Sequence, residues 1–563
     1  MAADSIPAQL ATACPAIRPA GPADAVAGVQ PSFVAAPAST AEASALLRAA
    51  ASLDLAVVPR GTGTRLHWGT PPARCDLVVE TTLLNRVIEH AAGDLVATVQ
   101  AGISLEYLAE VLGQAGQRLA LDPPSLNLPE PGPDQREPGQ PERDQPGPGP
   151  AAADLPFGTE AVPSPTGDRE PRRPASRGTI GGVIAAGAAG PLRFRYGSPR
   201  DLLIGITVVR ADGTVARSGG KVVKNVAGYD LGKLFAGSRG TLGLITEATF
   251  RLHPVPSAIA YITVECAAAA DACRLITAGI DSPLVPVAAE IDWPGADSPV
   301  LLGFALEGDA TAMAERSAEL ADLLAHAAHH SGLATVSAGP QPARSPTREG
   351  LRAVPEVSEN PPRWWGAGPA AQSDGTVLQI AFWPGDLGLV LAEVRTAAGA
   401  AGLDPAVGGS AAAGLLHVAV PADATPDSVA AFVADIRSAL GHVSPVSDHH
   451  RLNDLQQAGR SHPPDLSHPH GRSHSPGQAH PSGRSHPPDP SRSPNSSHDT
   501  NRSRAIDAHP PARASAVVLH APADVSALID LFGPVPSLGL MRAVKDQFDP
   551  DCRMAPGRFA GGI

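Results

Sequence analysis

Glycine recurs at the joints of the stretch from Arg177 to Pro256, and this stretch limits the possible folds more than any other part of the chain. Between the glycines lie two alternating runs rich in β-branched residues, 202–209 and 243–252, which predict strands. A backbone without Cβ atoms lets N–H groups approach a ligand closely. Several such turns suit a diphosphate or a flat heterocycle. A glycine-rich all-β turn region is the alternative, and this stretch alone leaves both interpretations open.

A second glycine loop, PRGTGTRLHWG at 59–69, follows a predicted buried strand at 55–58. Pro59 ends that strand, and Gly61 and Gly63 free the turn to surround an anion with main-chain N–H groups. No Gly-Lys-Ser/Thr follows, so the loop is not a P-loop. It is not GxGxxG at the start of a helix either, which excludes a Rossmann fingerprint. The alternative is a turn without a ligand.

The first 120 residues alternate predicted strands and helices, an α/β pattern. Ser39 and Glu42 form a capping box that begins a helix ending near Leu53. Another helix is expected at 104–113, and further strands at 31–36, 76–80 and 94–100.

A different α+β arrangement follows Pro256. The order of its first elements resembles half of a ferredoxin-like unit, β-α-β-β-α. Strands are expected at 261–265, 284–291, 300–306, 377–383, 414–420 and 516–520, and helices at 267–279, 311–331, 385–400, 427–440 and 538–548. We expect the C-terminal tail, 548–559, to return to the first domain.

Two blocks have compositions that cannot bury enough apolar surface to fold. The first is rich in Pro, Gly and charged residues. The second contains a near-repeat of twelve residues with GRSH at its start, and we interpret it as a linker. The predicted organisation is a mobile N-terminus (1–30), the first domain in two parts (31–124 and 177–256), disordered insertions (125–176 and 448–513), a cap domain (257–447) and a returning C-terminal segment (514–563).

Charge and cysteine content narrow the functional classes. The net charge of −13 argues against a nucleic-acid partner. The five cysteines form no CxxC pair, which disfavours an iron–sulfur cluster or a cysteine-held zinc, and no metal site is predicted. The N-terminus has no secretory signal pattern and no long apolar run occurs, so we expect a cytoplasmic protein.

Six motifs occur in an order that resembles the vanillyl-alcohol-oxidase (PCMH) type of FAD-binding flavoproteins. They are PRGTGTRL, VQAGISLEYL, TIGGVIAAGAAG, YGSPRDLLIGITVVRADGTV, GGKVVKNVAGYDLGKLFAGSRGTLGLITEATFRLHP and FDPDCRMAPGR. Within them, KNVAGYDLGKLFAGSRGTLG is similar to the FAD-binding subunit of bacterial glycolate oxidase (glycolate dehydrogenase). The resemblance implies an α+β fold, with a two-subdomain FAD-binding domain and a ferredoxin-like cap.

The resemblance also implies which residues hold FAD. The backbone of residues 60–64 would cradle the diphosphate, and the later motifs would continue along the flavin, ribityl chain and adenine. Covalent members carry a histidine where this chain has Thr64, and His67 is out of register, so non-covalent FAD is expected. The expected cofactor-binding residues are Pro59, Arg60, Gly61, Thr62, Gly63, Thr64, Gly102, Thr179, Gly181, Gly182, Asp201, Asn225, Gly228, Tyr229, Asp230, Gly240, Thr241, Gly243 and Ile245.

The family chemistry is oxidation of a small 2-hydroxy acid, glycolate or D-lactate, by hydride transfer to flavin N5. The resemblance implies a complex with a catalytic flavin subunit and an iron–sulfur subunit, and through these partners an indirect link to the inner face of the membrane. Catalytic residues stay unassigned; Tyr229 and His417 are the weak candidates. An FAD-binding relay or assembly subunit without a substrate site of its own is the alternative. The basic residues near the motifs that could bind a substrate carboxylate are Arg193, Arg195, Arg200, Lys221, Lys224 and Lys233.

Overall fold

The computed structural model describes residues 6–124, 178–220, 230–329, 354–367, 369, 375–441 and 514–563 of the chain. Both segments predicted to be disordered, 125–176 and 448–513, lie outside the described residues. So does the segment 221–229. We call residues 6–124, 178–256 and 538–563 the first lobe, and residues 257–441 and 514–537 the cap.

A four-stranded sheet begins the first lobe, with the strand order β1-β2-β4-β3. The strands β2, β4 and β3 are parallel, as expected when a helix connects β2 to β3, and β1 joins antiparallel. Ser39 caps the connecting helix α2, because its side chain accepts a hydrogen bond from the Glu42 N–H. The bounds are β1 (Ile17–Pro19), β2 (Phe33–Ala35), β3 (Val57–Arg60), β4 (Leu77–Glu80), α1 (Ile6–Ala13) and α2 (Thr40–Ser52).

The structure corrects the prediction of a mobile N-terminus for residues 6–30. Helix α1 packs on α2, and Leu10 and Cys14 are fully buried in the same core as Leu46 and Leu77. The Ala/Pro-rich composition hid the few apolar side chains that dock this segment. A second difference concerns Pro59, which continues β3 instead of ending it, because Pro59 and Arg60 pair with β4.

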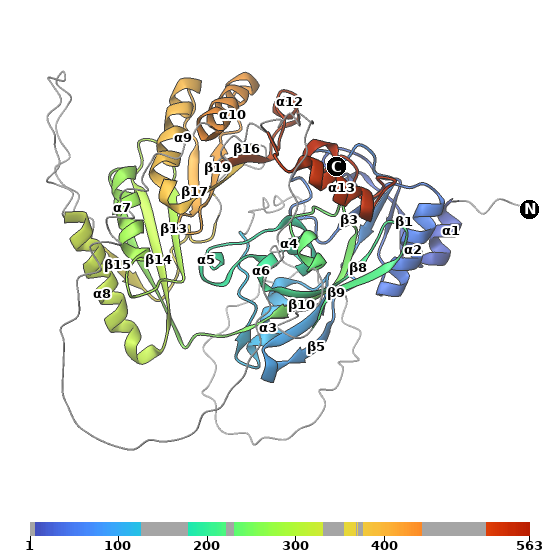
Figure 1. The fold of residues 1–563 in the computed structure, drawn as a ribbon, viewed down its shortest axis with the longest axis horizontal. Coiled ribbons are helices and arrows are strands. Elements are labelled where there is room, and N and C mark those ends of the chain that lie inside the picture. Colours follow the sequence, from blue (N-terminus) through green and yellow to red (C-terminus); the bar gives the residue numbers. More distant parts are fainter. Residues whose placement is uncertain are drawn as a thin grey trace, which may run out of the picture. The chain divides into compact units, whose positions relative to one another are not determined.

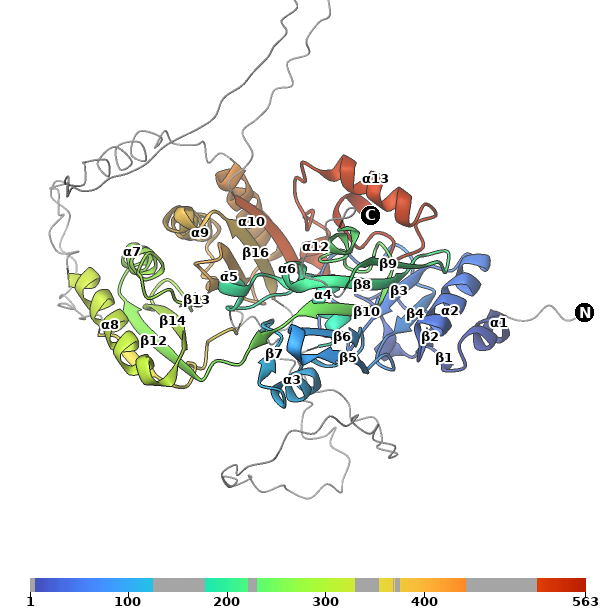
Figure 2. The same ribbon diagram turned by 60° about the horizontal axis from the view of Figure 1, so that its bottom comes forward.

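A five-stranded antiparallel sheet completes the first lobe, in the order β5-β6-β10-β8-β9 (Figure 2). The two runs of the glycine-rich stretch form its strands β8 and β10, as predicted. Its strands are β5 (Val87–Ala91), β6 (Val96–Gln100), β8 (Leu203–Val209), β9 (Val215–Gly219) and β10 (Leu244–Arg251); β7 (Gln117–Arg118) pairs separately with β11 (His253–Pro254). The helices are α3 (Leu105–Gly113), α4 (Ile180–Ala186), α5 (Arg193–Tyr196), α6 (Pro199–Leu202) and α13 (Leu538–Phe548).

The C-terminal tail returns to the first lobe, as predicted. The Val57 N–H donates to Arg553 O at 2.8 Å, and the Ala555 N–H donates to Val57 O at 2.7 Å, so the tail runs beside β3. Met554 is fully buried in the core beneath that strand.

The cap contains an eight-stranded antiparallel sheet in the order β15-β12-β14-β13-β17-β18-β16-β19. Two β-α-β-β-α units meet where β13 pairs with β17, which extends the predicted ferredoxin-like half to two halves. The strand β17 was not predicted, since AVGGS has too little bulk for a strand pattern. The strands are β12 (Ala258–Cys266), β13 (Ala288–Trp293), β14 (Val300–Gly308), β15 (Glu356–Ser358), β16 (Thr376–Phe382), β17 (Ala406–Ser410), β18 (Leu415–Val420) and β19 (Ala514–His520).

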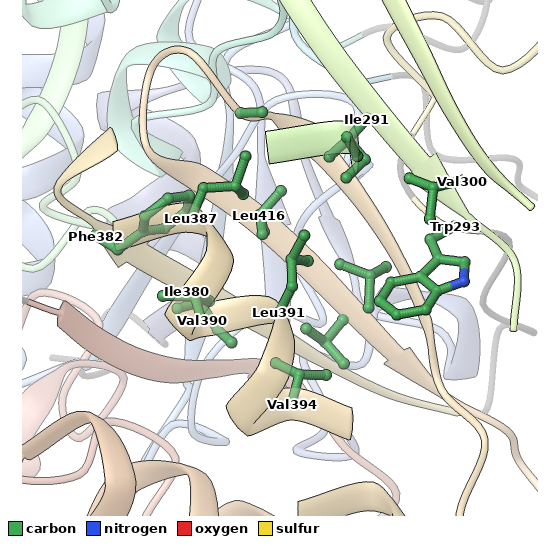
Figure 3. Close-up of a cluster of buried hydrophobic side chains, with 14 of the residues drawn as sticks. Ile291, Trp293, Val300, Ile380, Phe382, Leu387, Val390, Leu391, Val394 and Leu416 are labelled. Carbon is green, nitrogen blue, oxygen red and sulfur yellow. The ribbon is translucent and has the colours of Figure 1, made fainter. Parts of the chain in front are cut away.

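Four helices cover one face of the cap sheet (Figure 1). Figure 3 shows the core between them: Ile380 and Leu416 from the sheet lie against Leu387, Val390 and Leu391 of α9. The helices are α7 (Ala269–Ile280), α8 (Ala310–His329), α9 (Leu387–Ala401) and α10 (Pro426–Gly441), with the short α12 (Ala523–Ser526) after β19. Because strand side chains alternate, the other face of the sheet carries a different set of residues.

Candidate functional site

An open cleft with about 840 Å³ of empty space lies in the first lobe, where three loops meet. The loops follow β3, precede and enter α4, and precede β10. Twelve of the predicted cofactor-binding residues line this cleft: Pro59, Arg60, Gly61, Thr62, Gly63, Thr64, Thr179, Gly181, Gly182, Gly240, Gly243 and Ile245. The structure therefore gathers residues that are up to 186 positions apart in the sequence.

The loop after β3 is packed too closely for a larger residue at Gly61. A Cβ atom there would lie 2.2 Å from Thr179 Oγ1. Thr179 in turn caps α4, since its Oγ1 accepts a hydrogen bond from the Gly182 N–H at 3.3 Å. Gly63 has φ +79°, a conformation that glycine adopts without strain. These contacts hold the β3 loop and the start of α4 side by side along the cleft.

The loop before β10 forms another wall of the cleft. Gly240 has φ +79°, and a Cβ atom there would lie 3.2 Å from the Pro59 ring. Thr241 is buried behind this wall instead of lining it: its hydroxyl donates to Ser238 O at 2.7 Å, and its carbonyl accepts from Lys545 Nζ at 2.7 Å. Its contacts support the loop from outside the cleft.

Three other predicted cofactor-binding residues lie outside the cleft. A Cβ atom at Gly102 would lie 1.7 Å from Thr81 O, so this glycine allows two backbone segments to pack. The Asp201 carboxylate accepts hydrogen bonds from the Ser198 N–H and hydroxyl at 2.8 and 2.7 Å, which caps α6. Asp230 is exposed and forms an ion pair with Lys233 at 3.3 Å. Asn225, Gly228 and Tyr229 lie outside the described residues.

The cleft also contains three arginines that the sequence patterns did not single out as ligand-binding: Arg558, which is buried, and Arg65 and Arg239, which are half-buried. Burial lowers the pKa of each guanidinium to about 10, and the charge of Arg558 lowers that of Arg239 further. Within the described ranges, no carboxylate forms an ion pair with any of the three. Their charges therefore lack a counter-ion from this part of the chain.

Four buried polar atoms at the cleft have no hydrogen-bond partner in the part of the chain that the structure describes. They are Thr62 Oγ1, Arg65 Nε, Arg239 Nη1 and Arg558 Nη1. A buried donor without a partner costs about 1–3 kcal/mol, so such groups usually meet a ligand or water. Donors of this kind beside unstrained glycine turns suit an anion such as a diphosphate. By contrast, Arg60 is already neutralised, since its Nη2 lies 3.0 Å from both Asp24 Oδ1 and Glu80 Oε2.

Histidines lie near the cleft without lining it. The His67 ring meets the His520 ring edge to face, with centroids 4.9 Å apart, and burial with the charges of His520, Arg65 and Arg558 lowers the pKa of His67 to about 4. His417, the weak catalytic candidate, lies half-buried on β18; burial, Arg193 and Arg65 lower its pKa to about 4. Both imidazoles are therefore uncharged at neutral pH.

Comparison with known proteins connects this cleft to a cofactor. A family model described as FAD binding domain matches residues 31–128 and 172–219, which include the β3 loop and the start of α4. The geometry of the cleft also fits FAD, because glycine turns and hydrogen-bond donors without partners suit an anionic dinucleotide. The donors of Arg239 and Arg558 come from outside the matched residues.

Two curated relatives align with part of the chain. Glycolate oxidase subunit GlcD of Bacillus subtilis is 32% identical over 226 residues, 40% of this chain and 38% of the relative. D-lactate dehydrogenase [cytochrome] 1 of Saccharomyces cerevisiae is 29% identical over 259 residues, 45% of this chain and 35% of the relative. The chain thus spans under two fifths of the length of these relatives.

The fold is similar to a solved structure of alkyldihydroxyacetonephosphate synthase, with a TM-score of 0.50 and 13% sequence identity. The match covers 94% of this chain and 76% of the other. This likeness concerns the fold alone, and it agrees with the predicted α+β class of an FAD-binding lobe with a cap. Residues 31–128 and 172–219 therefore form an FAD-binding domain, and FAD is the cofactor of this chain.

Proposed function

We propose that this chain is an FAD-dependent oxidoreductase that takes part in oxidation of a small 2-hydroxy acid, glycolate or D-lactate, to the 2-oxo acid. One observation carries the proposal: the cleft of the FAD-binding domain holds three buried or half-buried arginines without a counter-ion in the described ranges. The relatives named glycolate oxidase subunit and D-lactate dehydrogenase support the substrate class.

The cofactor would lie along the cleft. The β3 loop at 60–64 and Thr179 would hold the diphosphate through main-chain N–H groups, and the Thr62 hydroxyl is free to join them. The guanidinium groups of Arg239 and Arg558 would offset negative charge on the cofactor. No histidine or cysteine is among the described residues that line the cleft, which supports non-covalent FAD with Thr64 at the position expected for a covalent link.

Bound FAD supplies the acceptor for the hydride that leaves Cα of the substrate. A base on the protein must accept the hydroxyl proton, and His417 is the described candidate: its imidazole is uncharged, although a pKa of about 4 makes it a weak base. The residue lies on the cap, so the reaction would use both lobes. Tyr229, the other weak candidate, lies outside the described residues.

The proposed setting is a glycolate oxidase complex, in which this FAD-binding subunit works with a catalytic flavin subunit and passes electrons to an iron–sulfur partner. The subunit name of the Bacillus subtilis relative supports an assembly. In the described part of the chain, no helix is both long and apolar enough to span a bilayer. Contact with the inner face of a membrane would therefore be made through partners or through residues outside that part.

An anaerobic visible spectrum of the purified protein, before and after glycolate or D-lactate, tests the proposal. Bleaching of the flavin band by either acid is the expected result, and it would show that the chain has its own substrate site. A flavin band that changes only after the partner subunits are added would instead indicate a relay subunit.

A further inference from the structure

The second face of the cap sheet adjoins the FAD-binding lobe, and it carries a few polar side chains beside an apolar cluster of Ala288, Ala305 and Tyr261. Glu290 and Ser410 pair across β13 and β17, and His417 lies on the same face of β18. Their sequence neighbours Ile291 and Leu416 point the other way, into the core beneath the helices. The side chains of Glu290 and Ser410 are both buried.

Two short segments of the first lobe face these residues. Arg65 Nη2 donates to Pro124 O at 2.6 Å, and the carboxyl group of Asp122 accepts from the Leu192 N–H at 3.0 and 3.2 Å. Arg193 follows directly and begins α5, which contacts β13 of the cap. Leu192, the residue before Arg193, packs against Ala288 and Ala305 of the cap sheet, so this segment lies against the face that carries Glu290 and His417.

Arg65 differs from the other two arginines of the cleft. The charges of Arg239 and Arg558 act on each other, and Arg558 Nη2 is held by Leu66 O and Trp68 O at 2.7 and 2.8 Å. Arg65 instead bonds to Pro124 O, and its Nη1 would lie 3.5 Å from a Cβ atom at Gly178, whereas Arg239 packs on the Phe532 ring. The Arg65 guanidinium therefore lies against a different part of the cleft wall from Arg239.

Charge balance indicates what Arg65 binds. The diphosphate of FAD carries two negative charges, and Arg239 with Arg558 supplies two positive charges. Arg65 adds a third, and no described carboxylate forms an ion pair with it. Arg65 can therefore bind a further, smaller anion beside the cofactor.

We propose that Arg65 binds the carboxylate of the 2-hydroxy acid substrate, with Arg193 adding positive charge from α5. This inference rests on the proposed function and names the substrate-binding residue. Arg65 Nε has no partner among the described residues, and Nη2 keeps one hydrogen beyond the bond to Pro124, so a carboxylate can accept two parallel hydrogen bonds. Such a clamp would select small acids with a free carboxylate.

The test uses the full-length protein loaded with FAD and two probes. Oxalate, which cannot donate a hydride, reports binding through the flavin absorbance, and glycolate reports reduction. In Arg65→Gln we expect the dissociation constant for oxalate to rise about 30-fold or more, with unchanged FAD content. Arg65→Lys keeps the charge but not the planar fork and should weaken binding by about tenfold. Arg86→Gln, at an exposed arginine before β5, is the control and should bind like wild type.

Other outcomes would decide against the proposal. Wild-type affinity for oxalate in Arg65→Gln would overturn it while the proposed function stands. Loss of FAD from both Arg65→Gln and Arg65→Lys, with thermal unfolding of the apo-protein unchanged, would assign Arg65 to the cofactor instead. A wild-type protein that neither responds to oxalate nor is reduced by glycolate or D-lactate, even with partner subunits, would overturn the proposed function as well.

Discussion

Two groups of charged side chains in the first lobe differ in how completely their hydrogen bonds are formed. Lys545 on α13 is fully paired: its Nζ donates to Asp549 Oδ2 at 2.6 Å, Thr241 O at 2.7 Å and Met554 O at 2.9 Å. Asp549 accepts two further bonds, from the Arg553 and Met554 N–H groups. The cleft arginines Arg65, Arg239 and Arg558 leave donors unpaired.

The difference separates a structural role from a binding role. Lys545 has as many acceptors as hydrogens, so nothing remains for a ligand, and its bonds fix the β10 loop to the C-terminal tail. Removing the arginine side chains from water is unfavourable, and in the described ranges no ion pair offsets it. A bound anion would supply the missing charge interaction. The ligand site is therefore recognised by charged side chains that lack hydrogen-bond partners, and burial alone does not identify it.

Removal of the paired charge should have the largest effect on stability. In Lys545→Met, the buried carboxylate of Asp549 loses its cation, so we expect the free energy of unfolding to fall by about 3–5 kcal/mol. Urea unfolding of the apo-protein measures it. Lys233→Met removes only a partly exposed ion pair with Asp230 and should cost less than about 1 kcal/mol. Equal losses in the two variants would contradict the structural assignment.

Removal of an unpaired charge should affect the cofactor more than the fold. In Arg239→Met we expect the dissociation constant for FAD to rise about 10- to 100-fold, since a charge-assisted hydrogen bond is lost. Apo-protein stability should change by less than about 1 kcal/mol, because relief of the unpaired charge opposes loss of the contact between Arg239 and the Phe532 ring. Fluorescence titration with FAD and urea unfolding measure the two effects. If Arg239→Met destabilises the apo-protein but leaves FAD affinity unchanged, Arg239 has a structural role and not a binding role.

Adding a methyl group at Gly102 tests whether this glycine has a structural role or a binding role. Its Cβ would lie 1.7 Å from Thr81 O, so Gly102→Ala should destabilise the fold by about 1–3 kcal/mol. Gly93→Ala is the control, since its Cβ would meet no atom within 4 Å. FAD affinity of the folded Gly102→Ala protein should equal that of wild type. A specific loss of FAD without loss of stability would return Gly102 to the cofactor site.

Asp122 should produce an effect that depends on pH. Burial raises its folded-state pKa to about 7, above the ordinary value. Its contribution to stability is therefore complete below about pH 4 and is lost as the pH rises through about 7. Asp122→Asn does not titrate and still accepts from the Leu192 N–H. Relative to wild type, its stability should be greater at pH 8 than at pH 5 by about 2–3 kcal/mol, because each pH unit between the two pKa values is worth about 1.4 kcal/mol. A constant difference between the two pH values in urea unfolding would contradict this assignment.

The sequence predicted the elements of the fold well where apolar residues repeat strongly. Strands β8 and β10 and helices α2 and α8 were found from alternation or helical spacing. The sequence did not predict β17, because Gly408 and Gly409 give no alternating pattern. It also did not predict the fold of residues 6–30, where Leu10 and Cys14 anchor an Ala/Pro-rich segment.

The candidate site was predicted in part, because glycine spacing shows where the backbone turns but not what it faces. Gly61 and Gly240 line the cleft, whereas Gly102 packs against Thr81 O. Arg239 and Arg558 could not be recognised from sequence, since arginine is usually exposed and only the fold reveals that these two lack partners.

Titration of the wild-type apo-protein with FAD, followed by acid precipitation, tests the central claim most directly. We expect one FAD per chain, a higher thermal unfolding midpoint on binding, and release of all flavin into the acid supernatant. Failure to bind FAD, or flavin retained in the precipitated protein, would contradict the account of a cleft whose unpaired arginines hold the cofactor without a covalent bond.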